Sequence, residues 1–203
     1  MNKMYPLFPQ AVFTVETSTP QFNDIIEFCQ TLDYGPNGGE NFTSINSDIL
    51  SLPKFSKIRT MIEYAIEEYT KNIMEWQSTF YITQSWINRN PPKSYHDEHF
   101  HTNSFISGVF YIKTLDPDFL SFSSGNRPVL SPPTKNYNMW NSQTYLLPVV
   151  DNMIVLFPSG LLHSVGQNRT SEDRFSLAFN VFLEGVLGAE LKSSHLRLTK
   201  KVM

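Results

Sequence analysis

The part of the chain beyond Trp76 consists of short apolar and aromatic runs separated by turn residues, and this succession limits the possible folds most strongly. Six or more strands with no helix between them favour an antiparallel sandwich or jelly roll over a doubly wound parallel sheet. Neither GxGxxG nor GxxxxGK[ST] occurs, so the familiar nucleotide sites are not expected. The predicted strands are Phe80 to Ile87, Phe105 to Lys113, Phe119 to Ser123, Thr144 to Val150, Met153 to Phe157 and Phe175 to Leu183.

The part before Trp76 predicts helices that support this sheet. From Pro53 to Trp76, apolar residues recur with helical period while Lys, Arg and Glu occupy the gaps. A shorter helix is predicted from Pro20 to Leu32, with Thr19 as its cap and Cys29 on its apolar face. The remaining predicted elements are a strand from Val12 to Thr17 and a loop from Asp33 to Ser47.

We therefore expect one mainly β domain over residues 1–203, a double-stranded β-helix buttressed by N-terminal helices. Residues 20–76 would be the helical support, 77–184 the β core and 185–203 a basic tail. A chain of 203 residues is long enough to bury a hydrophobic core without crosslinks.

Composition excludes several classes of protein. Cys29 is the only cysteine, so disulfide frameworks and multi-cysteine zinc sites are ruled out, and any metal must bind His, Asp or Glu. The net charge of −3 gives no general attraction to nucleic acid. No apolar run approaches the roughly 18 to 20 residues of a membrane span, and the first residues do not resemble a signal peptide. We expect a cytoplasmic protein without membrane contact; nothing in the sequence indicates its oligomeric state.

Four of the five histidines fall in two short segments, SYHDEHFHTNS and FPSGLLHSVGQN. Residues two apart on a strand point to the same side, so His99 and His101 could offer two imidazoles to one metal ion. His163 could supply a third if both strands reach the same end of the barrel. The alternative is a solvated, hydrogen-bonded histidine cluster beside Asp97 and Glu98.

The strand RFSLAFN, which follows His163, adds a cation. Arg174 and Ser176 share one face of this strand. An arginine directed into the same cavity as three imidazoles requires an anion, and its planar fork suits a carboxylate. The pattern indicates a metal-bound dicarboxylate.

At residues 80–184 the sequence resembles the 2-oxoglutarate (2OG) and Fe(II)-dependent oxygenases, specifically a group of about 200 residues found in bacteria and phages. The resemblance is carried by SWIN, HFHTNSFISGVFYI and NMIVLFPSGLLHSVGQNRTSEDRFSLAFN. It implies a double-stranded β-helix with Fe(II) at its open end. It also implies an enzyme that uses 2OG and O2 to hydroxylate or otherwise oxidise a substrate, with release of succinate and CO2.

The resemblance assigns roles residue by residue. It implies iron ligation by His99, His101 and His163, and binding of the distal carboxylate of 2OG by Arg174 with Ser176. Tyr111 lies where related oxygenases place a hydroxyl on the same carboxylate. From the residues alone, Tyr111 could equally be a core aromatic, and Ser176 a small strand residue.

One departure from the family concerns the ligands. Such oxygenases commonly use two histidines and one carboxylate, whereas the HxH motif puts an imidazole in the carboxylate's place. His96, Glu98 and His163 would restore the usual set. We prefer His99 and His101 because HFH leads directly into the following strand, as the resemblance does.

Two other functions fit the same residues. A cupin-like metal dioxygenase would use the three histidines without needing Arg174 for a co-substrate. A sugar-binding or structural jelly roll would use none of them, and Trp86, Tyr137 and Trp140 could then stack on a ligand. The long segment from Gly125 to Asn141 could be a substrate lid or an ordinary connection. The substrate itself is not indicated by the sequence.

Overall fold

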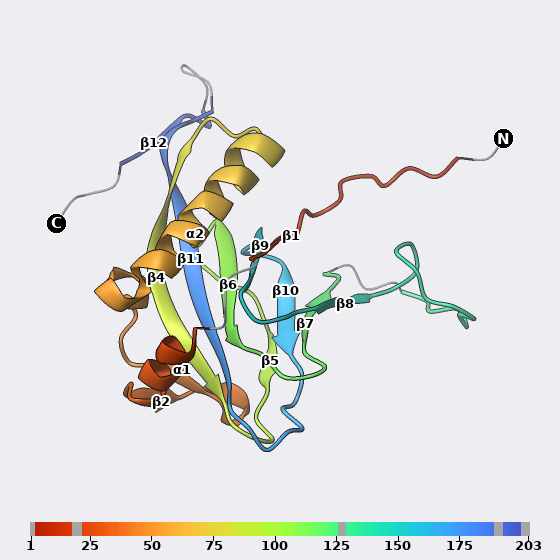
Figure 1. Cartoon of the computed structure of the whole chain (residues 1–203). Coiled ribbons are helices and arrows are strands. Elements are labelled where there is room, and N and C mark those ends of the chain that lie inside the picture. Colours follow the sequence, from red (N-terminus) through yellow and green to blue (C-terminus); the bar gives the residue numbers. More distant parts are fainter. Residues whose placement is uncertain (1–2, 18–21, 126–128, 189–192, 200–203) are drawn as a thin grey trace.

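The computed structural model describes residues 3–17, 22–125, 129–188 and 193–199, which form two antiparallel sheets with helices on one side. The major sheet has the order β1-β9-β6-β11-β4-β3-β2, with β12 paired to β11, and the minor sheet has the order β5-β10-β7-β8. Figure 1 shows α2 lying across the outer face of the major sheet, with the minor sheet on its other side. The expected mainly β architecture with helical support is confirmed.

The strands are β1 (Phe13–Glu16), β2 (Tyr34–Pro36), β3 (Phe42–Ser44), β4 (Thr79–Asn90), β5 (His96–His99), β6 (Ile106–Lys113), β7 (Phe119–Ser123), β8 (Thr144–Pro148), β9 (Met153–Pro158), β10 (Leu162–Val165), β11 (Arg174–Leu187) and β12 (Leu196–Leu198). The helices are α1 (Asn23–Gln30), α2 (Ser56–Glu67), the π-helical η4 (Glu68–Ile73) and the short 3₁₀ helices η1 (Gly38–Glu40), η2 (Ile49–Ser51) and η3 (Pro53–Phe55).

Strand β11 shows why the major sheet is buried on both faces. Its alternate residues Phe175, Leu177 and Phe179 belong to the core beneath the helices, because successive side chains of a strand point to opposite faces. The intervening Arg174 and Ser176 are also buried but line a cavity between the sheets. A strand that looks uniformly apolar or small in sequence therefore has one packing face and one polar face.

Strands β6 and β11 approach each other closely at Gly108. A Cβ atom there would lie 2.2 Å from the Phe179 ring, so only glycine fits. The gap left by Gly108 is filled by this ring, which packs in the core shared with α2 through Ile58 and Ile62. The pairing of β6 with β11 brings Tyr111 opposite Ser176.

The structure corrects several of the expected boundaries. The segment Asp33 to Ser47 is not only a loop, because β2 and β3 form a hairpin that extends the major sheet beyond β4. The long helix ends at Ile73 rather than Trp76 and finishes in a π-helical turn. The shorter helix begins at Asn23, and its expected start at Thr19 and Pro20 lies outside the described residues.

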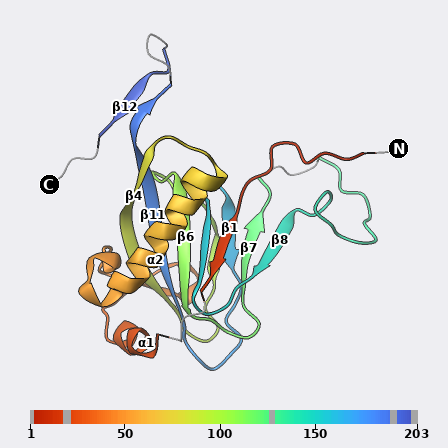
Figure 2. The ribbon, with the colours of Figure 1, turned by 45° about the horizontal axis from the view of Figure 1, so that its top comes forward.

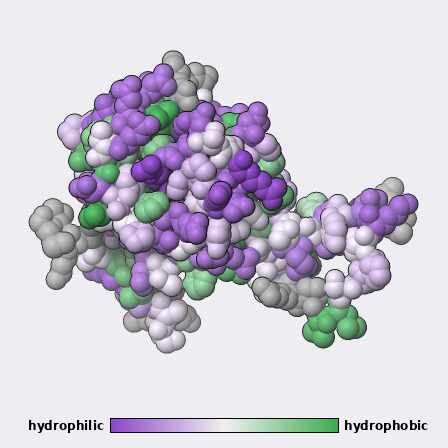
Figure 3. Space-filling model, turned by 90° about the horizontal axis from the view of Figure 1, so that it is seen from below, coloured by the Kyte–Doolittle hydropathy of each residue, from purple (hydrophilic) through white to green (hydrophobic). Residues whose placement is uncertain are grey.

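The N-terminal segment and the connection between β7 and β8 project from the sheets on the same side of the molecule (Figure 2). Both carry exposed apolar side chains, and Figure 3 shows a hydrophobic cluster on the lower side of the projection. The exposed ones include Met4, Tyr5, Leu7, Phe8, Val129, Leu130, Tyr137, Met139 and Trp140. Among the helices of the described residues, none is long and apolar enough to cross a membrane.

Candidate metal centre

Three histidines converge at one point between the sheets: His99 on β5, His101 in the segment after β5, and His163 on β10. His163 lies opposite His99 in the β5–β10 pairing. The ring centroids are 4.3 Å apart for His99 and His163, 5.1 Å for His101 and His163, and 5.3 Å for His99 and His101. One nitrogen from each ring lies within 4.8 Å of the other two, a separation that suits shared coordination of one ion.

His99 and His101 do not lie on one extended strand, as the sequence had predicted. Strand β5 ends at His99, so His101 lies in the following segment rather than on the same extended strand. Its backbone N–H donates to Ser159 O at 2.9 Å, which ties this segment to the end of β9. Strand β10, which carries His163, was not predicted, because the four residues LHSV are too short for a clear alternation.

Hydrogen bonds orient all three imidazoles. The Nδ1 atoms of His99 and His163 lie 2.8 Å and 2.9 Å from the carbonyl oxygens of Asp97 and Leu161. A carbonyl can only accept, so each Nδ1 carries the proton and each Nε2 keeps its lone pair. His101 Nδ1 meets the Asn180 amide oxygen at 2.7 Å in the same way. Such contacts fix the tautomer of metal-binding histidines and leave Nε2 as the ligand atom.

A network of hydroxyl groups lies beside the Nδ1 atom of His101. Ser107 Oγ lies 2.9 Å from His101 Nδ1 and donates to Asn180 Oδ1 at 3.1 Å. Ser107 also contacts Ser159, whose hydroxyl donates to Ser104 at 2.8 Å. Ser107, Ser159 and Asn180 belong to the SGV, FPS and FN segments of the sequence motifs, and Ser104 to HFHTNS. Their position next to a histidine could not be seen in sequence, because each lies on a different strand or loop.

Replacing Asn180 tests this support. In Asn180→Ala the His101 Nδ1–H loses its strongest acceptor, and we expect the affinity for Fe(II) or Co(II) to fall about ten- to hundredfold. Asn180→Asp is the matched control, since a carboxylate oxygen still accepts from Nδ1. Calorimetric titration of metal into each variant measures the effect. Equal metal affinity in wild type and Asn180→Ala would contradict the role given to Asn180.

Burial keeps these imidazoles neutral. Burial first, and then the neighbouring His99 and His101, lower the pKa of His163 to about 3. Burial also lowers the pKa of His101. A metal requires an unprotonated ring nitrogen, so the site is ready to bind at neutral pH without first losing a proton.

The alternative ligand set does not assemble in the structure. Glu98 is exposed on β5, and the ring centroid of His96 is 6.4 Å from that of His99. The group of possible metal ligands found within the described residues consists of imidazoles only. The geometry thus favours His99, His101 and His163.

Arg174 lies at the other end of the same cavity. Its side chain is 2% exposed and its Nε donates to Asp118 Oδ2 at 2.6 Å. The guanidinium carbon is 5.2 Å from the centroid of the Tyr111 ring. Ser176 pairs with Tyr111 on one side and with Asn88 on the other, which makes a polar row across three strands. Asp118 was missed in the sequence because nothing in its loop marks it as a partner of Arg174.

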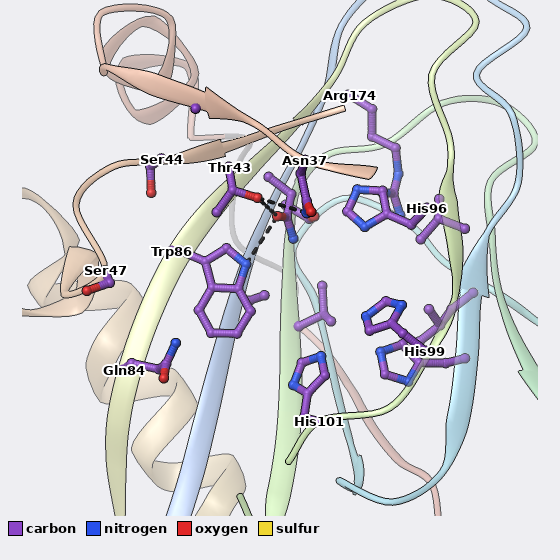
Figure 4. A pocket seen from close by; sticks show the side chains of 18 of the residues that line it. Asn37, Thr43, Ser44, Ser47, Gln84, Trp86, His96, His99, His101 and Arg174 are labelled. Carbon is purple, nitrogen blue, oxygen red and sulfur yellow. Dashed lines mark hydrogen bonds between the residues drawn. The ribbon is translucent and has the colours of Figure 1, made fainter. Parts of the chain in front are cut away.

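The cavity that joins these two ends has a volume of about 540 Å³. One wall comes from the β2–β3 hairpin and β4, where Trp86 Nε1 and Thr43 Oγ1 both donate to Asn88 Oδ1, at 3.1 Å and 3.2 Å (Figure 4). The described residues of the expected lid, Gly125 to Asn141, do not line this cavity; Gly125 and Met139 line a separate one beside β8.

Comparison with known proteins finds a family model that matches the part of the chain containing this arrangement. Residues 84–180 match the family model described as "Putative 2OG-Fe(II) oxygenase", a segment that includes the three histidines and Arg174. This match supports the resemblance of residues 80–184 to the 2OG-Fe(II) oxygenases. A search of curated proteins found no match.

Solved structures of 2OG-Fe(II) oxygenases share the fold. A 2OG-Fe(II) oxygenase family oxidoreductase from Burkholderia pseudomallei has a TM-score of 0.56 at 13% identity, with 78% of this chain and 77% of that chain covered. HygX from Streptomyces hygroscopicus, with nickel, 2OG and hygromycin B bound, has a TM-score of 0.60 at 12% identity, covering 85% and 82%. A Pseudomonas putida prolyl-4-hydroxylase has a TM-score of 0.59 at 13% identity, covering 84% and 92%.

The residues of the cavity fit the two groups that 2OG-Fe(II) oxygenases use, a divalent metal and 2OG. Three imidazoles with free Nε2 atoms suit a divalent first-row metal. The buried Arg174 at the far end suits a carboxylate. An all-imidazole set would differ from the usual one, because an imidazole would replace the carboxylate ligand. With three neutral ligands a bound divalent metal would keep its full charge of +2, which would favour binding of a dianion such as 2OG.

Proposed function

We propose that His99, His101 and His163 hold the Fe(II) of this oxygenase and that Arg174, with Ser176 and Tyr111, receives the distal carboxylate of 2OG. The main support for this proposal is that one cavity contains both the three-histidine cluster and the buried arginine. When bound, Fe(II) together with 2OG and O2 supplies the oxidation of a C–H bond, with succinate and CO2 as co-products. Hydroxylation is the outcome we propose.

The protein's own residues place the reactants. Arg174 fixes the far end of 2OG, so that the keto acid end is directed toward the histidines. The inner face of the major sheet contributes Val109, Ala178 and the Trp86 ring as an apolar surface that keeps water from the reacting carbon. The protein supplies placement and a shielded pocket, and the metal and co-substrate carry the chemistry.

We propose that the primary substrate enters between Trp86 and the β2–β3 hairpin. The side chains that line this region are neutral, chiefly hydroxyls and amides (Asn37, Thr43, Ser44, Ser47, Gln84 and Asn88). A charged group on the substrate would meet no opposite charge here, so the part that reaches the iron is uncharged. The solved relatives do not decide the substrate, since HygX is crystallised with hygromycin B and another relative is a prolyl hydroxylase.

Anaerobic addition of Fe(II) and 2OG to the metal-free protein tests the proposal. Chelation of Fe(II) by the 1-carboxylate and 2-keto oxygens of 2OG gives a weak visible charge-transfer band, and we expect this band only when both are present. Iron binding without the band would instead favour a metal dioxygenase that does not use 2OG, the alternative suggested by the all-histidine ligand set. Absence of iron binding would contradict both functions and favour a non-enzymatic jelly roll.

A further inference from the structure

The cavity end near Arg174 contains buried polar atoms that lack hydrogen-bond partners. Within the described part of the chain, His96 Nε2 and the Tyr111 hydroxyl belong to residues that line this cavity, and neither has a hydrogen-bond partner. The unpaired amide of Asn90, opposite Arg174 in the β4–β11 pairing, lines a separate cavity. Leaving such an atom buried and unpaired costs about 1–3 kcal/mol, so a cluster of them indicates that a ligand completes the site.

His96 lies between the two ends of the cavity. Figure 4 shows it between Arg174 and His99, and both of these side chains act on it electrostatically. Its backbone is held in place because Tyr95 N–H donates to Gly39 O at 2.8 Å. A side chain at Gly39 would collide with Tyr95 O, so the hairpin can approach this closely only with glycine.

His96 is neutral and lies outside the cluster of three histidines. Burial first, and then the charge of Arg174, lower its pKa to about 3, so the ring carries a single N–H. It does not belong to the group of nitrogens that lie within 4.8 Å of one another. A neutral imidazole can place its proton on Nε2 when an acceptor is bound there.

The ion pair of Arg174 shows why an additional donor is needed. Arg174 Nε is bound to Asp118, whose side chain is 7% exposed, so the buried pair has no net charge. A third buried charge, the carboxylate of 2OG, then has to be stabilised by hydrogen bonds as well as by the guanidinium. A carboxylate has about four positions that can accept a hydrogen bond. The N–H groups of Arg174 that are not used by Asp118 cannot fill all of them.

We propose that His96 donates an Nε2–H hydrogen bond to the distal carboxylate of 2OG, beside Arg174 and Tyr111. This inference rests on the proposed function, because it assigns a further binding residue to the same co-substrate. His96 entered the sequence analysis only as an alternative iron ligand, and the structure gives it a different position.

Binding of 2OG to Ni(II)-loaded protein, measured by calorimetry, tests the inference without turnover. In His96→Leu we expect the Kd of 2OG to rise about ten- to hundredfold, the range for a hydrogen bond to a charged group. His96→Gln places an amide N–H near the position of Nε2 and should recover much of the affinity. The second ligand is 2-oxopentanoate, which has the same keto acid end but no distal carboxylate. Its Kd should be the same in wild type and His96→Leu.

The outcomes separate this inference from the proposed function. An unchanged Kd of 2OG in His96→Leu would overturn the inference, as would an equal loss for 2OG and 2-oxopentanoate. Loss of Ni(II) binding in His96→Leu would assign His96 to the metal and also overturn it. If the wild-type protein itself fails to bind 2OG, the proposed function fails instead. Without 2OG, His96→Leu should melt at the same temperature as wild type or higher, because it removes an unpaired buried atom.

Discussion

His163→Ala should lose stoichiometric iron binding. His163 is 4% exposed in the middle of β10, and its ring is the one that lies closest to both other imidazoles. Its removal leaves two protein ligands, one of which, His101, follows the end of β5 in a loop. Two imidazoles bind Fe(II) more weakly than three, so the metal should dissociate when the protein is diluted. Activity should then fall to background. Metal analysis after gel filtration in the presence of Fe(II) measures the loss.

Matched histidine variants sharpen this test. His195 is exposed near the C-terminal end, so His195→Ala removes a histidine without touching the cluster and should keep full iron content. His101→Ala should lose iron, whereas Glu98→Gln should retain it, because Glu98 is exposed on β5. Stoichiometric iron in His163→Ala would refute the ligand assignment. Loss of iron in Glu98→Gln would restore the alternative set that contains His96 and Glu98.

The sequence located all six strands of five residues or more in the described part of the chain. The run Phe119 to Ser123 matches β7, and Phe105 to Lys113 differs from β6 by one residue. Such runs carry enough alternation to be recognised. Strands β2 and β3 have three residues each and contain Gly, Pro and Ser, which resemble a loop. They become strands only because β4 offers them an edge, a long-range effect that local patterns do not contain.

In the site, too, local sequence predicted some residues, whereas others depend on contacts between distant parts of the chain. The three histidines and Arg174 were selected by residue type and by the family resemblance, and the structure brings them into one cavity. The partners that tune them, Asn180 for His101 and Asp118 for Arg174, come from distant parts of the chain. Nothing in their local sequence marks them, since an amide in a strand and an acid in a loop are ordinary. Strand pairing places them, so they are visible only in the fold.

Arg174→Gln should abolish measurable binding of 2OG while leaving the iron site intact. Removing one side of a buried charge pair costs about 2–5 kcal/mol, which corresponds to a loss of affinity of at least about thirtyfold. The three histidines lie at the other end of the cavity, so the metal content should stay the same. Spectroscopic titration of the anaerobic Fe(II) protein with 2OG measures the effect, since the charge-transfer band should no longer form at concentrations that saturate wild type.

The partner of Arg174 requires a second variant. Arg174→Gln leaves Asp118 buried without a counter-charge, and this alone could destabilise the fold by about 3–5 kcal/mol. The double variant Arg174→Gln/Asp118→Asn removes both charges and should recover most of the melting temperature without recovering 2OG binding. Arg197→Gln, at an exposed arginine of β12, is the control for a loss of positive charge alone. If the double variant binds 2OG as wild type does, Arg174 does not hold the distal carboxylate, and the histidine cluster would have to serve a metal enzyme of another class.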